Sequence, residues 1–144
     1  MFADGPTGAR EVRGCRLTGR DGMRQAEWVG EPSVVAVVRV RDALHRLLVG
    51  WQLDDEVVDD ALLVVTELLA NVVEHARTPF RLAVRLQGPL LHVAVSDDRV
   101  DVPARSLNVA AGQVSGLRLV TAVALRWGYR EHEAGKTVWA ELVV

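Results

Sequence analysis

The chain contains very little cysteine: Cys15 is the only one among its 144 residues. One cysteine excludes an intrachain disulfide and a metal site built from several cysteines. Proteins of a reducing compartment rarely contain disulfides. The count therefore fits the cytoplasmic location that we expect.

Long apolar runs are also absent. No window approaches the roughly 18 apolar residues that a membrane-spanning helix needs. Phe2 is followed by Asp, Gly, Pro and Arg, so the N-terminus has no apolar core of the kind found in secretion signals. We therefore expect no association with a membrane.

An excess of one charge is missing as well, because 17 basic and 19 acidic residues give a net charge of −2. A domain that binds nucleic acid through its overall charge is usually strongly basic, so we expect no direct nucleic-acid partner. Apolar residues make up 49% of the chain, which is too many for a wholly disordered protein. The length is that of one domain.

The first 26 residues lack apolar periodicity and contain five glycines and five arginines. Chain ends of this kind are commonly poorly ordered, so we predict a flexible N-terminal tail over residues 1–26. The tail either has no role or serves as an arm that binds a partner. A single domain is expected over residues 27–144, beginning with a short edge strand at Glu27–Val29.

Two amphipathic helices are predicted next. Glu31-Pro32-Ser33 has the residues of a helix start, and apolar side chains then recur at helical spacing over Val34–Leu48. A second helix begins at Asp54 or Asp55, because either carboxylate can accept the free N–H groups of a first turn. It ends before Thr78-Pro79, since proline cannot continue a helix.

Alternating apolar and polar residues predict strands in the second half of the chain. Phe80–Leu86 and Leu90–Ser96 are joined by the short turn Gly88-Pro89 and should form an antiparallel hairpin. Tyr129–Glu133 and Thr137–Leu142 form a second pair of strands. A sheet with helices is therefore expected.

Polar residues lie at the margin of the second helix's apolar face. Glu67 and Asn71 are four residues apart and fall one above the other, with His75 next along the same side. Taken alone, this pattern favours a surface pair. The functional alternative is a metal and phosphate site, because an Asn carbonyl suits Mg²⁺ and a carboxylate can accept a hydroxyl proton.

Two further segments have candidate chemistry. Asp97 stands at the end of a strand, where its carboxylate can accept a hydrogen bond from an exocyclic amine such as that of adenine; a plain Asp-rich turn is the alternative. Gly112–Val120 is a Gly-containing loop that opens a helix, whose free N–H groups attract phosphate; simple capping is the alternative. That helix should continue to Trp127 and stop at Gly128.

Together these segments resemble the GHKL ATPase superfamily. Glu67-Leu68-Leu69-Ala70-Asn71-Val72-Val73-Glu74-His75-Ala76 is similar to the N-box of the bacterial anti-sigma-factor serine kinases, which reads roughly E-L-x-x-N-A-x-x-H-A. Asp97 and Pro103 match the family's D-x-[SG]-x-x-x-P. Gly112–Val120 resembles its G-x-G-R-G-L-x-L-V segment, and Gly135–Trp139 also matches. The resemblance covers about residues 27–144.

The resemblance implies a two-layer α/β sandwich of the Bergerat (GHKL ATPase) type, with a mixed, mostly antiparallel sheet covered on one face by helices. Nucleotide would lie between the N-box helix and the Gly-rich loop. The implied function is that of an anti-sigma regulator that binds ATP and Mg²⁺, holds a sigma factor and phosphorylates a serine on an antagonist protein. A homodimer is a further option.

The resemblance also implies a role for each site residue. Asn71 would bind Mg²⁺, Glu67 would be the general base, and Asp97 would read adenine. The remaining phosphate contacts would come from Gly112, Gly116 and Leu117 through their backbone, and from Thr137.

Three residues depart from the family pattern. Arg99 stands where a small residue would let the loop approach the base, and Val114 and Ser115 replace a Gly and an Arg of the phosphate loop. These departures motivate an alternative, a non-catalytic interaction module of the same fold that binds nucleotide weakly or not at all. A third reading, the ATP-binding half of a histidine kinase, is disfavoured because no phosphoacceptor helix is present.

Overall fold

The computed structural model describes residues 10–18, 22–99 and 116–144. Its strands are β1 (Arg10–Thr18), β2 (Met23–Gly30), β3 (Phe80–Gln87), β4 (Leu90–Asp97), β5 (Arg126–His132) and β6 (Gly135–Val143). Its helices are α1 (Val34–Gly50), α2 (Asp55–Asn71) and α3 (Gly116–Val123), and α2 continues into the π-helical turn η1 (Val72–Ala76).

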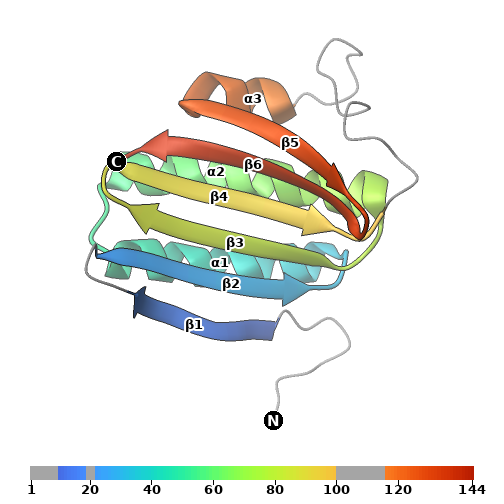
Figure 1. The fold of residues 1–144 in the computed structure, drawn as a ribbon, viewed down its shortest axis with the longest axis horizontal. Helices are drawn as coiled ribbons and strands as arrows, with labels where there is room; N and C mark the ends of the chain where they lie inside the picture. Colours follow the sequence, from blue (N-terminus) through green and yellow to red (C-terminus); the bar gives the residue numbers. More distant parts are fainter. Residues whose placement is uncertain (1–9, 19–21, 100–115) are drawn as a thin grey trace.

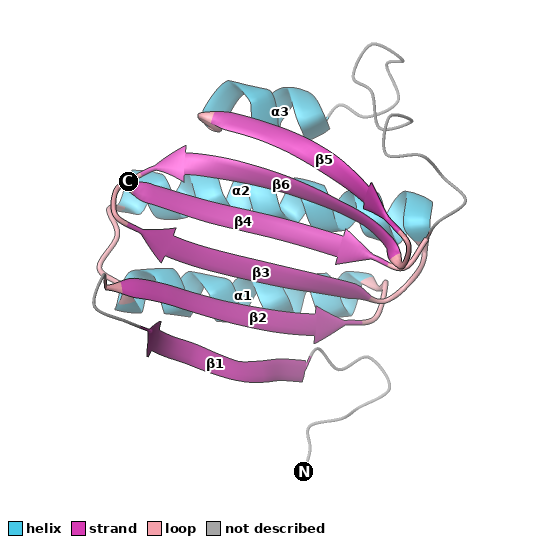
Figure 2. Ribbon diagram, viewed as in Figure 1, coloured by secondary structure: helices cyan, strands magenta, loops and turns pink. Residues whose placement is uncertain are grey.

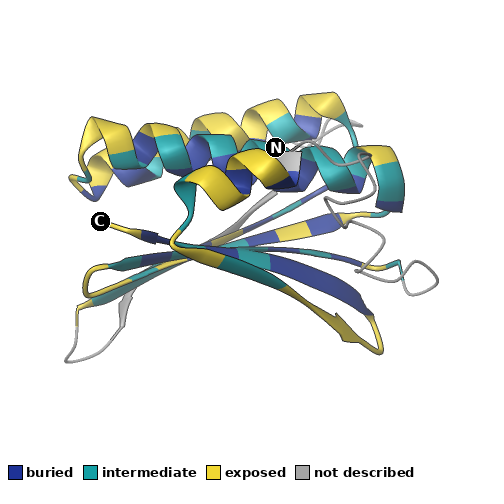
Figure 3. Cartoon of the chain, turned by 90° about the horizontal axis from the view of Figure 1, so that it is seen from above, coloured by how far each residue is buried: buried dark blue, intermediate teal, exposed yellow. Residues whose placement is uncertain are grey.

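The six strands form one sheet in the order β1-β2-β3-β4-β6-β5 (Figure 1). The helices lie on one face of this sheet (Figure 2), and the opposite face carries none in the part of the chain that is described (Figure 3). The expected two-layer α/β sandwich is confirmed. Every described strand pair is antiparallel, so the sheet has no parallel pair there.

The N-terminal region differs from the flexible tail predicted for residues 1–26. Over Arg10–Thr18 the chain forms the edge strand β1, which pairs with β2, and β2 begins at Met23 instead of Glu27. The register of this pair shifts between Val12 and Arg16. Such a bulge breaks the period-two alternation that marks a strand, which explains why the sequence pattern missed β1.

The two long helices begin and end close to the predicted positions. The Ser33 hydroxyl accepts a hydrogen bond from the N–H of Ala36 at 3.2 Å and caps α1. Asp54 precedes α2, and Asp55 and Glu56 place negative charge at the positive end of the helix dipole. No described helix has the length and apolar character needed to cross a bilayer.

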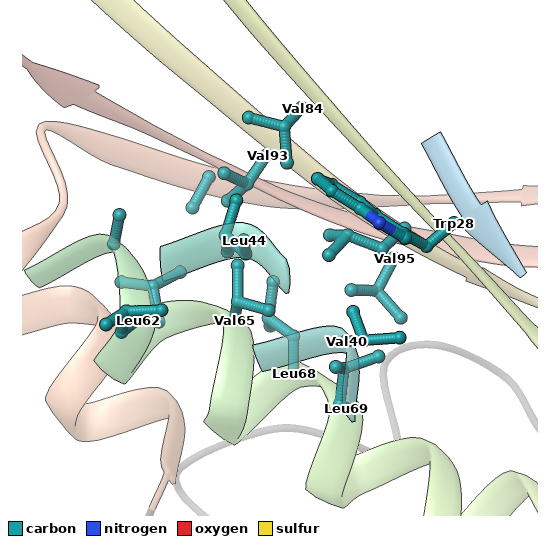
Figure 4. Close-up of a cluster of buried hydrophobic side chains, with 14 of the residues drawn as sticks. Trp28, Val40, Leu44, Leu62, Val65, Leu68, Leu69, Val84, Val93 and Val95 are labelled. Carbon is teal, nitrogen blue, oxygen red and sulfur yellow. The ribbon is translucent and has the colours of Figure 1, made fainter. Parts of the chain in front are cut away.

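The core lies between the helices and the sheet. Leu44 of α1 and Leu68 and Leu69 of α2 point toward Trp28 of β2 and Val95 of β4, and all are buried (Figure 4). Burial of each such leucine contributes roughly 1.5–3 kcal/mol relative to exposure. Because α2 packs on β4 and β6 and lies between α1 and α3, its C-terminal end is fixed near the end of β4 (Figure 1).

The third helix is shorter than predicted. It ends at Val123, and Trp127 and Gly128 lie in β5 instead of closing the helix. The Trp127 indole N–H donates to the Thr121 hydroxyl at 2.7 Å. A Cβ on Gly128 would come within 2.7 Å of the Trp139 ring, so this glycine serves a close approach within the sheet and not a helix stop.

Candidate functional site

The predicted N-box lies at the junction of α2 and η1. Asn71 is the last residue of α2, and Glu67 precedes it by one turn; both side chains are half-buried. The backbone N–H of Arg77 donates to the carbonyl of Val72 at 2.7 Å, the five-residue spacing of a π turn. π turns within helices occur frequently at functional sites.

The amide of Asn71 is only partly satisfied. Its Nδ2 atom is buried and has no hydrogen-bond partner. The hydroxyl of Thr66 is likewise buried and has no hydrogen-bond partner. A buried polar group without a partner costs about 1–3 kcal/mol. Amide oxygen and nitrogen are assigned from their surroundings, so this side chain can present either a donor to phosphate or an oxygen to a cation. Asn71 therefore has an unused polar atom for a ligand.

The oxygen atoms of Glu67 and Asn71 at this end of α2 fit Mg²⁺ better than a metal ion whose ligands all come from the protein. Among the described residues, no three His, Cys, Asp or Glu side chains gather in a way that could hold a metal. Mg²⁺ usually keeps several waters and takes one or two protein oxygens together with substrate phosphates. Asn71 can supply such an oxygen, and no partner is found for the Glu67 carboxylate in the described part of the chain.

Asp97 is buried at the end of β4 and forms an ion pair with Lys136 of β6. The Lys136 Nζ lies 2.8 Å from Asp97 Oδ2, and each side chain is only 4% exposed. The other oxygen, Oδ1, accepts the backbone N–H of Arg99 at 3.0 Å. A carboxylate has about four acceptor positions, so lone pairs remain for an exocyclic amine. The carboxylate itself is held in one orientation.

Sequence reasoning missed Lys136. Asp97 and Lys136 are directly opposite in the β4–β6 register, and this pairing joins distant parts of the chain that local patterns do not connect. One signal was present, because Lys136 is the only lysine in the sequence and directly follows a glycine in a turn. A lone lysine in an arginine-rich chain is a reasonable candidate for a specific role.

Thr137 lies apart from the other predicted site residues. Side chains alternate between the two faces of a strand, so Lys136 faces the helices and Thr137 faces away from them. The Thr137 hydroxyl is hydrogen bonded to that of Ser96 at 2.8 Å and to His132 Nε2 at 3.2 Å. Its hydroxyl therefore belongs to the opposite face of the sheet from Asp97 and Asn71.

Arg99 ties the end of β4 to η1. Its guanidinium donates to the backbone carbonyl of His75 at 2.6 Å, where positive charge also suits the end of a helix. Close by, the backbone N–H of Asp98 donates to the Thr78 hydroxyl at 3.0 Å. The arginine that departs from the family pattern thus has a structural use on the N-box side.

The phosphate loop is described only at its end. Gly112, Val114 and Ser115 lie outside the described residues. Gly116 begins α3, and the side chain of Leu117 is fully buried in the core, which leaves its backbone as the part available to a ligand. The start of α3, the end of α2 and the end of β4 all lie toward the same end of the molecule (Figure 1).

The two-layer sandwich, with its antiparallel sheet covered on one face by helices, is the fold of a GHKL-type ATPase domain. Residues 31–142 match the histidine kinase-like ATPase domain family. The match covers well over half of the chain, and the chain therefore belongs to this family and to the GHKL superfamily. A search of curated proteins found no match.

Proposed function

We propose that the chain is an anti-sigma regulator that binds ATP with Mg²⁺, holds a sigma factor and phosphorylates a serine on an antagonist protein. The observation that carries the proposal is the unsatisfied amide of Asn71, buried at the junction of α2 and η1. Family membership supports nucleotide binding. The anti-sigma role rests on the similarity of residues 67–76, 97–103 and 112–120 to the anti-sigma kinases.

Each residue has a defined part in the proposed transfer. The oxygen of the serine hydroxyl bonds to the terminal phosphorus as the bond between that phosphorus and the bridging oxygen of ATP breaks, and the hydroxyl proton passes to the Glu67 carboxylate. Asn71 would hold Mg²⁺, which supplies positive charge to the phosphates. Asp97 would accept the exocyclic amine of adenine. Phosphoryl transfer needs mainly such positioning and charge stabilisation.

The exposed side of α1 is the proposed contact surface for the sigma factor. Val34 and Val38, which are 70% and 50% exposed, lie along one line of the helix with Arg41 and His45. Exposed apolar residues rimmed by charged ones are common at protein interfaces.

Calorimetric titration with ATP tests the proposal. In Asn71→Ala, the part of the ATP affinity that depends on Mg²⁺ should disappear, because the metal oxygen is removed while the fold remains. Glu67→Gln should keep its ATP affinity and transfer phosphate to the antagonist roughly a hundredfold more slowly or worse. Unchanged Mg²⁺ dependence in Asn71→Ala, or equal loss of binding and transfer in Glu67→Gln, would contradict these roles.

A second candidate is the non-catalytic interaction module. The observation in its favour is that both oxygens of Asp97 are already engaged and that its side chain is only 4% exposed. The same titration separates the two. If the wild type captures a sigma factor and shows no heat with millimolar ATP and Mg²⁺, the module is the better description.

A further inference from the structure

A hollow of about 270 Å³ lies at one end of the sheet, on the face turned away from the helices. Val29, Arg81 and Ser96 line it from three neighbouring strands, where they stand directly opposite one another in the register. Its other lining residues include His132, Asp97 and Asp98. Figure 3 shows that no described helix covers this face. Because Asp97 lines it, the hollow adjoins the candidate nucleotide site at the end of β4, while Arg81 and Ser96 lie on the other face of the sheet.

A hydrogen-bonded chain of three side chains forms one wall. The Thr137 hydroxyl contacts Ser96 Oγ at 2.8 Å and His132 Nε2 at 3.2 Å. If His132 donates to Thr137, then Thr137 donates to Ser96, and the Ser96 proton is left to point into the hollow. The three groups can thus act together as a donor chain that ends at a ligand.

The opposite wall carries a cation that has no partner among the described residues. Arg81 is exposed on β3, and across the described residues its guanidinium has no ion pair or hydrogen bond. A guanidinium offers five N–H donors in a planar fork that matches oxyanions. Arg85 lies on the same face of β3, also exposed, but does not line the hollow. The chain thus provides its own matched control.

We propose that this hollow binds a phosphate monoester. Arg81 supplies charge and a fork of donors, and the Ser96 hydroxyl, which is oriented through Thr137 and His132, supplies a further donor from β4. Donors that arrive from two neighbouring strands, in addition to the planar fork of Arg81, suit a tetrahedral oxyanion better than a planar carboxylate. The ester is either a small free molecule or a phosphorylated side chain of a partner. Asp98, whose carboxylate shares the rim, opposes the anion and limits its affinity.

Nuclear magnetic resonance titration of the full chain with phenyl phosphate tests the site. Amide shifts are expected around Ser96, Thr137 and His132. Arg81→Gln should weaken binding about tenfold or more, the size expected for a charge-assisted hydrogen bond, while Arg85→Gln should bind like the wild type. Asp98→Asn should bind severalfold more tightly because a repelling charge is removed. All three side chains are exposed, so the variants should fold.

Titrations with two further ligands identify the kind of ester and can contradict the proposal. A phosphoserine peptide that binds at least tenfold more tightly than phenyl phosphate identifies a phosphorylated partner, and equal affinities identify a small ester. Benzoate, a planar anion of similar size, should bind more weakly than either. The proposal is overturned if Arg81→Gln and Arg85→Gln lose affinity equally, if benzoate binds as well as phenyl phosphate, or if the shifts appear only around Asn71.

Discussion

Asp97 and Lys136 form a buried ion pair, so the effect of replacing one of them on stability depends on whether the other is present. Removing one partner from a buried pair leaves an uncompensated charge and typically costs about 3–5 kcal/mol. We therefore expect Lys136→Met and Asp97→Asn each to lower the free energy of unfolding by about that amount. The double variant Asp97→Asn/Lys136→Met should be more stable than Lys136→Met alone, because it contains no buried charge at this position. Urea denaturation measures all three.

The same three variants help to interpret a loss of nucleotide binding. A single Asp97 variant that fails to bind ATP could have lost either the base contact or its local structure. If the double variant regains stability and still does not bind ATP, the carboxylate itself is needed for the base. If the loss of unfolding free energy in the double variant equals the sum of the losses in the two single variants, Asp97 and Lys136 are not coupled.

Glu141 carries a second ion pair, on the face of the sheet away from the helices. Hydrogen bonding from the Arg126 guanidinium holds the pKa of Glu141 below its ordinary value of 4.5, with help from His92 and against the effect of burial. A carboxyl group whose pKa is lower in the folded state stabilises the fold at pH values above its pKa in the unfolded state. That stabilisation is lost as the pH falls through the folded pKa.

Glu141→Gln should therefore be destabilised at neutral pH and not in acid. Arg126 is 64% exposed, so solvent screening limits the expected loss to roughly 0.2–1 kcal/mol. The difference from the wild type should shrink as the pH falls below 4.5 and the wild-type carboxylate becomes protonated. Urea denaturation over a series of acidic pH values measures this. A difference that stays constant with pH would rule out the ion pair as its cause.

Where β5 connects to β6, Gly135 leaves no room for a side chain. Gly135 has a φ of +144°, and a Cβ there would overlap the carbonyl oxygen of Asp97. Gly135→Ala should therefore push β6 away from β4 and cost at least the roughly 1–3 kcal/mol of a strained backbone. Because Lys136 is the next residue, ATP affinity should fall as well.

Gly88→Ala is the matched control for this turn. Gly88 also has a positive φ, +57°, but open space surrounds the position of its Cβ. Its substitution should cost only about 1–2 kcal/mol, from the left-handed conformation alone, and should leave ATP affinity unchanged. Thermal denaturation and calorimetry compare the two variants. Equal losses of stability would show that contact with Asp97 has no effect.

Most elements could be predicted because their signals are local. The helical period gave α1 and α2, and the alternation of apolar residues gave β3, β4 and β6. The pairing of neighbouring strands decides the two exceptions. A bulge between Val12 and Arg16 hides the alternation of β1, and the Trp139 ring over Gly128 explains why that glycine belongs to a strand.

The positions of the candidate site residues in the fold could be predicted where one helix carries them. Spacing along α2 brought Glu67 and Asn71 together, and the end of a strand marked Asp97. The identity of the residue opposite Asp97 depends on the pairing of β4 with β6, which separates Lys136 from Thr137 by face of the sheet. No pattern within either strand contains that information.

At the scale of the whole molecule, the β1–β2 hairpin lies outside residues 31–142, which match the family. β1 is at one edge of the sheet, and β2 and β3 separate it from β4. Deleting residues 1–18 should therefore lower the melting temperature by exposing the edge of β2 and leave ATP affinity unchanged. Calorimetry measures both quantities. A folded deletion variant that no longer binds ATP would instead connect β1 to the site.

The pairing of β4 with β6 also sets the time at which the molecule becomes able to bind. A chain emerges from the ribosome N-terminus first, so Asp97 appears well before Lys136. Until β6 docks between β4 and β5, Asp97 lacks its counter-ion and the end of the sheet is incomplete. A nascent chain that stalls before Lys136 can build α1 and α2 and still lack the carboxylate in its final place. Any contact of nucleotide with a fully paired Asp97 therefore has to wait until β6 has been synthesised.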